Sequence, residues 1–149
     1  MKKIFAFSVL IVIAFICTSC SITPETPTEG IWYCEKIGIS IEFYIDPFYS
    51  SCYPRIRSVR LYDNEENYRE LEQNWHYSGQ LDFCYKDIDG NEIIIYSGFY
   101  KYRDNKFILY LHSKGDPNDN YKTQIELDKE ECVFVQIDSY DKIKGMKNS

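Results

Sequence analysis

The sequence predicts an all-β protein: a single small antiparallel barrel or sandwich, arranged as a meander of seven or eight strands that follows a cleaved signal peptide. Three observations predict this class. The first 19 residues have the layout of an export signal, and the chain from Gly30 onward alternates apolar and polar residues with a period of two. Turn-forming residues then separate the alternating runs at short intervals.

Residues 1–19 have the composition of a secretory signal peptide. Lys2 and Lys3 form a short basic start, and an apolar run of thirteen residues, Ile4–Ile16, follows with only Ser8 as an interruption. A helix that crosses a bilayer needs about 20 apolar residues. The run therefore predicts a segment that is cleaved rather than a lasting transmembrane span.

The end of this segment resembles the lipobox of bacterial lipoproteins. Small residues Thr18 and Ser19 precede Cys20, although Cys17 stands where the motif usually has Leu. The resemblance implies that Cys20 is acylated and becomes the first residue of the mature chain; a plain signal peptide is the alternative. Because Ser21 is not the Asp that retains lipoproteins at the inner membrane, the resemblance implies the outer membrane of a two-membrane bacterium. In a one-membrane bacterium it implies the outer face of the cell membrane.

Residues 20–29 follow as a lipidated tether. Ser, Thr, Pro and Glu make up nearly all of this segment after Cys20, and such a composition cannot bury enough apolar area to fold. In an extended form stiffened by proline, the segment reaches about 30 Å at roughly 3.1 Å per residue. That length lifts a small domain off the lipid headgroups.

Residues 30–140 are long enough for one domain with its own core. Loss of residues 1–19 removes two lysines and no acidic residue, so the formal net charge falls from -6 to -8. Such a surface repels nucleic acid and anionic lipid and attracts basic proteins. We therefore expect a monomer that contacts the membrane through its lipid anchor and binds a small ligand or a basic protein, but no nucleic acid.

The β domain contains several runs with strand-like alternation. The clearest is 37–45, where Ile and Phe alternate with Gly, Ser, Glu and Tyr. Similar runs predict strands around 59–61, 81–85, 93–95, 107–111, 125–127 and 133–137. Turns are predicted at 87–92 (DIDGNE), 103–106 (RDNK), 115–120 (GDPNDN) and 127–131 (LDKEE). The charged stretch 64–73 permits a helical turn, which we do not favour, and residues 141–149 are expected to form a frayed C-terminal tail.

No residue pattern predicts an active site or a metal site. His76 and His112 have no cysteine or second histidine at ligand spacing, so we interpret both as ordinary strand or loop residues. The acidic turns at 87–92 and 115–120 lack the glycine and glutamate spacing of a calcium-binding EF-hand loop. No nucleophile elbow, phosphate-binding glycine loop or zinc-protease motif occurs. We therefore expect no enzymatic activity, no metal and no cofactor.

Four cysteines besides Cys20 remain in the mature chain: Cys34, Cys52, Cys84 and Cys132. An even number in an exported protein permits two disulfides in any of three connectivities. Because the first and last strands of a closed barrel are neighbours, we favour Cys34 with Cys132, which leaves Cys52 with Cys84. The alternative is that all four thiols stay reduced and serve as packing residues.

The opening of the domain, GIWYCE at 30–35, together with LDFCYKD at 81–87 and CVFVQID at 132–138, resembles a set of small bacterial lipoproteins that begin Gly-x-Trp-Tyr-Cys. That family implies a lipid-anchored β domain and carries no assigned activity. The Gly-x-Trp start is also similar to that of lipocalins, in which the Trp plugs one end of the barrel. These resemblances imply a lipocalin-like meander in which Trp32 is a core residue.

Tyrosine is abundant, and YSGFYKY at 96–102 is the densest cluster. Many tyrosines reflect strand preference, but Tyr also offers contact area with a polar handle. A Ser-Gly pair begins at Ser97 and a Lys-Gly pair at Lys114, which resembles the motifs of lipoproteins that inhibit C-type lysozyme. That family implies that Ser97 and Lys114 enter the lysozyme cleft. With Tyr100 and Tyr102 they make up the predicted binding surface.

The sequence therefore predicts a lipid-anchored, non-catalytic binding module at the cell surface. The alternatives are an inhibitor of C-type lysozyme and a structural component of the envelope. A long apolar cavity behind Trp32 is expected of a ligand-binding barrel, and a filled core argues against that class.

Overall fold

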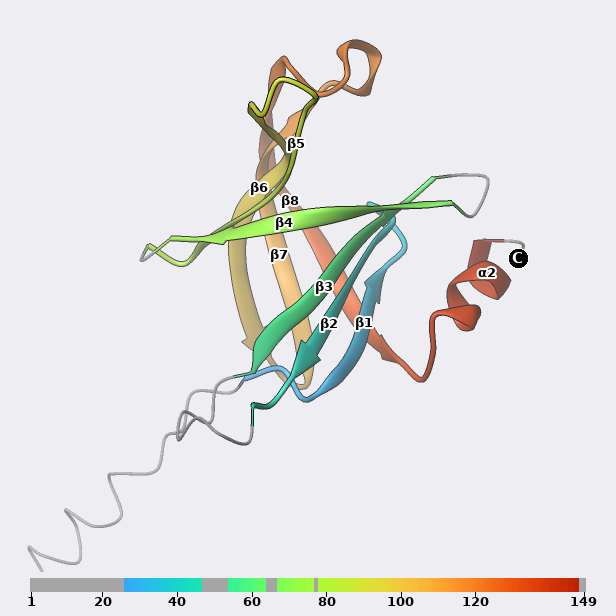
Figure 1. The fold of residues 1–149 in the computed structure, drawn as a ribbon. Coiled ribbons are helices and arrows are strands. Elements are labelled where there is room, and N and C mark those ends of the chain that lie inside the picture. Colours follow the sequence, from blue (N-terminus) through green and yellow to red (C-terminus); the bar gives the residue numbers. More distant parts are fainter. Residues whose placement is uncertain (1–25, 47–53, 64–66, 77, 148–149) are drawn as a thin grey trace, which may run out of the picture.

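The computed structural model describes residues 26–46, 54–63, 67–76 and 78–147, and these form a closed antiparallel barrel of eight strands (Figure 1). Each strand pairs with its neighbours in the sequence, and β1 pairs with β8 to close the barrel. The predicted antiparallel barrel is thus confirmed, in its meander form. The strands are β1 (Gly30–Cys34), β2 (Ile39–Tyr44), β3 (Arg55–Tyr62), β4 (Tyr68–Trp75), β5 (Gln80–Lys86), β6 (Glu92–Arg103), β7 (Lys106–Gly115) and β8 (Gln124–Ile137).

Apolar side chains from all eight strands fill the barrel interior. In β2, for example, Ile39, Ile41 and Phe43 are buried in this core, because alternate residues of a strand face the same side. An eight-stranded barrel is just wide enough for its own side chains to fill it. β-branched and aromatic residues, which favour strands, supply most of the filling.

Trp32 closes one end of the barrel. Its side chain is 2% exposed and packs edge-on against Tyr102, with the ring centroids 5.9 Å apart. Its indole Nε1 donates a hydrogen bond to the carbonyl oxygen of Thr28 at 3.0 Å. Trp32 is therefore a core residue, as predicted, and it lies at the end where β1 begins.

The connections between strands fall at two ends because neighbouring strands run in opposite directions. The β4–β5 and β6–β7 turns lie at the Trp32 end. The β1–β2, β3–β4, β5–β6 and β7–β8 connections lie at the opposite end, which we call the mouth end. Chain entry at Gly30 and the mouth are thus at opposite ends of the barrel (Figure 1).

Two of the predicted turns have the backbone geometry that their residues favour. Asp104 and Asn105 both have positive φ, 52° and 58°, and join β6 to β7 in a two-residue hairpin. In the β5–β6 turn the carboxylate of Asp87 accepts hydrogen bonds from the backbone N–H groups of Asp89 and Asn91 at 3.0 and 2.8 Å. The turns predicted at 103–106 and 87–92 are confirmed.

The structure differs from the sequence-based prediction in three strands. The runs 30–34 and 68–75, which were not predicted as strands, form β1 and β4. The predicted turn at 127–131 lies inside β8, where Lys129 has a φ of 44° and the pairing with β7 shifts register. A bulge of this kind accommodates turn-favouring residues without ending the strand.

The C-terminal segment is a helix rather than the frayed tail that we predicted. Helix α2 (Asp141–Lys147) lies outside the barrel beside β1 (Figure 1). Its Ile143 is 1% exposed and packs in a cluster with Tyr33 and Ile137, which β1 and β8 present on their outer faces. Burial of this outer apolar patch holds the helix in place. Within the described ranges, no helix is both long enough and apolar enough to span a membrane.

Candidate functional site

A cleft opens at the mouth end where β4 and β5 separate. These strands pair only over 72–75 and 81–84; beyond this, β4 continues beside β3, and β5 continues beside β6 (Figure 1). The cleft has a volume of about 670 Å³. We call it the β4–β5 cleft; its lining comprises Arg69, Glu70 and Glu72 of β4, residues 85–89, and Asn120 and Lys122 of the β7–β8 connection.

A second cavity of about 420 Å³, the mouth pocket, adjoins the β4–β5 cleft, and Arg69 lines both. Ile37, Leu61, Tyr96 and Tyr121 are among the residues that line the mouth pocket. Burial raises the pKa of Tyr96 to about 12, with nearby Tyr121 adding to the effect. The phenol of Tyr96 therefore stays protonated near neutral pH and can donate a hydrogen bond.

The β7–β8 connection is folded so that it presents Tyr121 at the mouth pocket. The carboxylate of Asp116 accepts a hydrogen bond from the backbone N–H of Asn118 at 2.9 Å, which caps a short 3₁₀ helix (Pro117–Asp119). Tyr121 then has a φ of 65°, which is uncommon for a bulky residue and is found where structure around it enforces it. A Cβ atom at Gly115 would lie 2.6 Å from the Cβ of Tyr121, so only glycine allows this approach.

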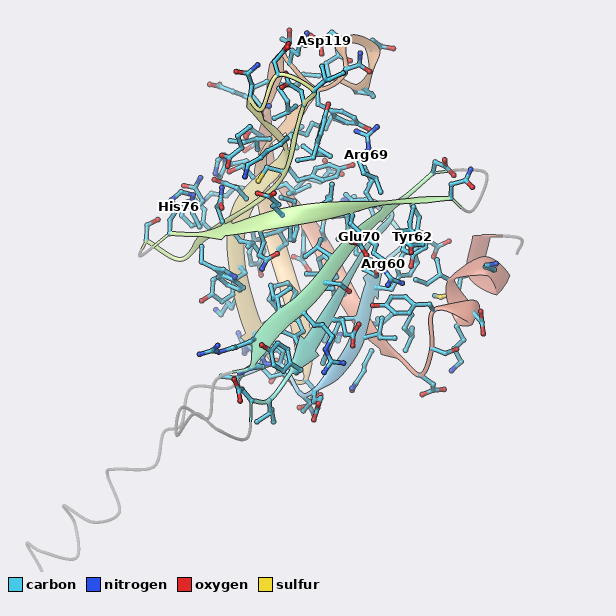
Figure 2. All side chains as sticks on the ribbon, in the orientation of Figure 1. Arg60, Tyr62, Arg69, Glu70, His76 and Asp119 are labelled. Atoms are coloured by element: carbon cyan, nitrogen blue, oxygen red, sulfur yellow. The ribbon has the colours of Figure 1, made fainter. Side chains whose placement is uncertain are left out.

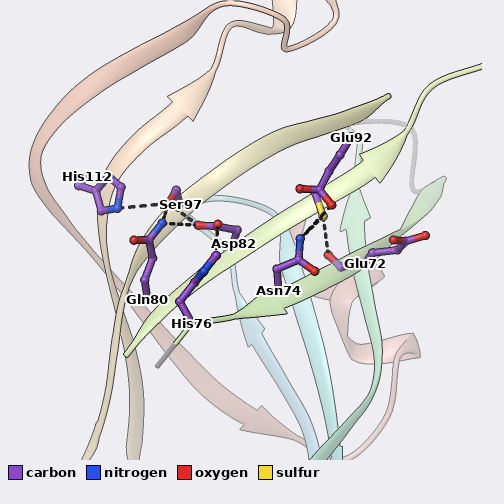
Figure 3. A network of polar contacts seen from close by, with 9 residues as sticks. Glu72, Asn74, His76, Gln80, Asp82, Glu92, Ser97 and His112 are labelled. Atoms are coloured by element: carbon purple, nitrogen blue, oxygen red, sulfur yellow. Dashed lines mark hydrogen bonds and ion pairs between the residues drawn. The ribbon is translucent and has the colours of Figure 1, made fainter. Parts of the chain in front are cut away.

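A polar network occupies the outer face of β5, β6 and β7 near the β4–β5 turn (Figure 3). The Ser97 hydroxyl donates to Asp82 Oδ1, and Gln80 Nε2 donates to both Asp82 Oδ1 and Ser97 Oγ at 3.0 Å. His76 Nε2 lies 2.7 Å from Asp82 Oδ2, and His112 Nε2 lies 3.2 Å from Ser97 Oγ. We call these five residues the outer polar network.

The outer polar network contains the residue types of a hydrolase triad in a different order. In such a triad the histidine lies between the serine and the aspartate. Here Ser97 lies between Asp82 and His112, and its hydroxyl donates a hydrogen bond to the carboxylate rather than to a histidine. Asp82 and Ser97 are 4% and 3% exposed, so neither is open to a substrate. The geometry therefore supports a structural link between neighbouring strands.

The environment of Asp82 favours its ionised form. Burial alone raises the pKa of this carboxyl, but the hydrogen bonds from Ser97, Gln80 and His76 outweigh burial and hold the pKa below its usual value. The two histidines, which lie 36 residues apart in the sequence, are thus joined through one buried carboxylate and one hydroxyl.

The structure does not bring the four residues of the predicted binding surface together. Ser97 is buried in the outer polar network, and Tyr102 is half-buried against Trp32. Tyr100 is 39% exposed near the Trp32 end, whereas Lys114 lies in β7 near the mouth end, opposite Tyr96 of β6.

The glycine after Ser97 also has a structural role. A Cβ atom at Gly98 would lie 2.6 Å from the carbonyl oxygen of Tyr110 in β7, so glycine permits close approach of these strands. Close packing therefore explains both Gly98 of the Ser-Gly pair and Gly115 of the Lys-Gly pair without a binding role.

The described cysteines all carry free thiols and occupy both faces of the sheet. Cys34 and Cys132 are buried in the barrel core and interact through their side chains. The hydrogen bond from Cys132, with the backbone N–H groups of Ile37 and Lys36, lowers the pKa of Cys34 to about 7, while the same contact raises the pKa of Cys132. The two cysteines of the favoured disulfide, Cys34 and Cys132, are therefore neighbours in the barrel core.

Cys84 lies in a different environment from this pair. It is fully buried, and its sulfur donates a hydrogen bond to the carbonyl oxygen of Glu72 at 3.7 Å. Burial, reinforced by the nearby carboxylates of Glu92 and Glu72, raises its pKa to about 11. Its predicted disulfide partner, Cys52, lies outside the described residues, as does Cys20.

In the part of the chain that the structure describes, no group of three His, Cys, Asp or Glu side chains is arranged to hold a metal ion. Comparison of the sequence and structure with protein-family models, curated proteins and solved structures found no match.

Proposed function

We propose that the protein is a lipid-anchored, non-catalytic binding module of the cell envelope, and that it holds a small ligand in the β4–β5 cleft and the adjoining mouth pocket. One observation carries this proposal: the two cavities adjoin at Arg69 and combine tyrosine side chains with hydrogen-bonding groups in one concave site. Small-molecule sites commonly combine a preformed concavity with a few polar groups that fix orientation.

The position of the site limits the kind of ligand. Phe107 contacts both Phe43 and Phe134 in the core, with ring centroids 5.5 and 5.2 Å apart, and all three side chains are buried. These rings occupy the interior where a lipocalin-type barrel would hold a long apolar ligand. We therefore propose a compact ligand with polar groups, bound at the mouth end.

The proposed anchor gives this site an orientation. If Cys20 is acylated, the tether enters the barrel at Gly30, at the Trp32 end. The mouth end then points away from the membrane, at the outer membrane of a two-membrane bacterium or the outer face of the cell membrane otherwise. A ligand-binding module benefits from this orientation because its site stays open to solvent.

The anchor is tested by metabolic labelling with a fatty acid. We expect label in the wild-type protein and in Cys17→Ala, because Cys17 leaves with the signal peptide. Cys20→Ala should carry no label. Label that persists in Cys20→Ala would contradict the proposed anchor without affecting the proposed cleft.

The ligand site is tested with a thermal-shift screen of small polar metabolites on the full-length protein in detergent micelles. We expect at least one compound to raise the Tm of the wild type. Leu61→Trp, which fills the mouth pocket, should abolish that shift, whereas Ile125→Trp on an exposed position of β8 should leave it unchanged. The proposal fails if no compound raises the Tm, or if Leu61→Trp responds as the wild type does.

A further inference from the structure

Arg69 places a guanidinium group at the junction of the two cavities. It pairs with Leu61 across the β3–β4 ladder, two residues before Leu71, whose side chain lies in the core. Since alternate residues of a strand face the same side, Arg69 is directed to the inner side of the barrel wall at the mouth. Figure 2 shows its position on β4 at the open end of the barrel.

Tyr85 provides a surface on which this guanidinium rests. The Arg69 Cζ atom lies 4.6 Å from the centroid of the Tyr85 ring. The hydroxyl of Tyr85 donates a hydrogen bond to the carbonyl oxygen of Asn120 at 3.0 Å, which fixes the ring against the β7–β8 connection. Stacking holds the guanidinium plane and leaves its N–H edge available to a ligand in the cleft.

Arg69 differs from the other arginines of the described residues in having no ion pair. Four arginines each have a carboxylate oxygen within 4.0 Å: Arg55 with Asp46, Arg57 with Glu42, Arg60 with Glu70, and Arg103 with Asp104. No ion pair or hydrogen bond of Arg69 occurs among the described residues.

Three of the four carboxylates that line the cleft with Arg69 are engaged with other groups. Glu70 lies 3.9 Å from Arg60, and Glu72 lies 3.5 Å from Lys86. Asp87 accepts hydrogen bonds from its own turn. The cleft therefore contains a cation with no ion pair to a described residue, while three of the four carboxylates around it are engaged elsewhere, which is the arrangement expected where a ligand supplies the anion.

We infer that Arg69 anchors an oxyanion group, a carboxylate or a phosphate, of the ligand in the β4–β5 cleft. The five N–H donors of a guanidinium match the two oxygens of such a group. The body of the ligand then lies toward Tyr96 and Tyr121 in the mouth pocket, where ring faces favour a flat or partly apolar group. This inference rests on the proposed function and specifies its ligand class.

The net charge of the chain makes the contact selective. A formal charge of -6 for the full chain opposes anions at long range. Binding therefore depends on the short-range contact with Arg69, and a ligand without an oxyanion lacks that contact. For this reason, removal of the guanidinium is expected to weaken ligand binding strongly.

The test is a titration of ¹⁵N-labelled full-length protein in detergent micelles, followed by amide chemical shifts. The probes are 4-hydroxybenzoate, its uncharged amide 4-hydroxybenzamide, and inorganic phosphate. We expect 4-hydroxybenzoate or phosphate, or both, to shift resonances of residues 69–72, 85–89 and 120–122. The amide should bind about tenfold more weakly than the carboxylate or worse, because hydrogen bonds to charged groups are the stronger ones.

Variants assign the effect to Arg69. Arg69→Gln should weaken binding of the effective anion about tenfold or more, and Arg69→Lys should restore only part of it because lysine lacks the planar fork. Arg103→Gln, which removes the same charge at the Trp32 end, should bind as the wild type does. Response to phosphate identifies a phosphate group as acceptable, and response to 4-hydroxybenzoate alone identifies a carboxylate.

Two results would overturn the inference, and they are distinguishable. If carboxylate and amide shift the cleft resonances with equal affinity, and Arg69→Gln changes neither, then the cleft binds ligands but Arg69 is not an oxyanion anchor. If no probe shifts cleft resonances at millimolar concentration, and the metabolite screen also finds no stabilising compound, the proposed function itself fails.

Discussion

The Ser97 hydroxyl donates a hydrogen bond to the carboxylate of Asp82, its partner across the β5–β6 strand pair. Ser97→Ala leaves this buried carboxylate short of a donor, so we expect the free energy of unfolding to fall by about 1–3 kcal/mol. Urea denaturation measures the change.

Ser113→Ala is the matched control, because Ser113 pairs with Ser97 across β6 and β7 but makes no side-chain hydrogen bond among the described residues. Ser113→Ala should lower the free energy of unfolding by less than about 0.5 kcal/mol. Equal effects of the two substitutions would mean that the outer polar network does not stabilise the fold.

The same contact gives a pH dependence with a defined sign. Hydrogen bonds hold the pKa of Asp82 in the folded state below its usual value, so the ionised carboxylate stabilises the fold at pH values above the unfolded-state pKa. This contribution is lost as pH falls through the depressed folded-state pKa. The difference in unfolding free energy between wild type and Ser97→Ala should therefore shrink below about pH 4. A difference that stays constant down to pH 2 would contradict this account.

Cys34 and Cys132 are expected to form a disulfide when the protein meets an oxidant. Their thiols interact inside the barrel, and the sequence between them closes a loop of about 100 residues, for which chain entropy predicts a stabilisation of about 4.7 kcal/mol. Mass spectrometry of wild type and Cys34→Ser, with and without reduction, should reveal the loss of two hydrogens only in the wild type. Cys84→Ser should leave that loss intact.

Helix α2 is expected to contribute to stability through a single buried side chain. Ile143 is 1% exposed against Tyr33 and Ile137, so Ile143→Ala should lower the free energy of unfolding by about 2–5 kcal/mol, or less if the short helix detaches. Ile88→Ala is the control, because Ile88 is fully exposed in the β5–β6 turn. If both variants unfold at the same urea concentration, α2 is not docked in solution.

The burial of Ser97 predicts that the protein does not inhibit C-type lysozyme. An acidic protein attracts a basic enzyme, but a serine that is 3% exposed and bonded to Asp82 cannot enter another protein's cleft without leaving its own network. A lysis assay on bacterial cell walls with high micromolar protein should show an unchanged rate. Inhibition that both Ser97→Ala and Lys114→Ala relieve, but Ser113→Ala does not, would reinstate the inhibitor hypothesis.

Much of the barrel could be predicted because its strands carry their own periodic signal. Apolar and polar residues alternate over 37–45, which indicates a strand directly, and the residues around Asp104 indicate a hairpin. β4 was missed because three of its eight residues, Arg69, Glu70 and Glu72, are charged and Leu71 is its only residue in the main core. Residues 141–147 were misjudged because their anchoring patch exists only after β1 and β8 are brought together.

The candidate site was less predictable than the fold. Arg69 lies in a charged stretch with no motif, and its unusual feature is the lack of an ion pair, which depends on where Glu70 and Glu72 find their partners. The link between His76 and His112 likewise runs through residues on three strands. Both are properties of tertiary arrangement, which spacing along the chain does not encode.

Closure of β1 onto β8 gives every described strand a neighbour on each side, but 68–71 of β4 and 85–86 of β5 keep one unpaired edge where these strands separate at the β4–β5 cleft. A lipid anchor confines copies of a protein to a plane and crowds them, and exposed strand edges under such crowding are templates for aggregation. The barrel limits this hazard to short unpaired stretches such as those at the β4–β5 cleft. Recognition by strand addition is limited to the same stretches, so selectivity toward a partner resides mainly in side chains and loops.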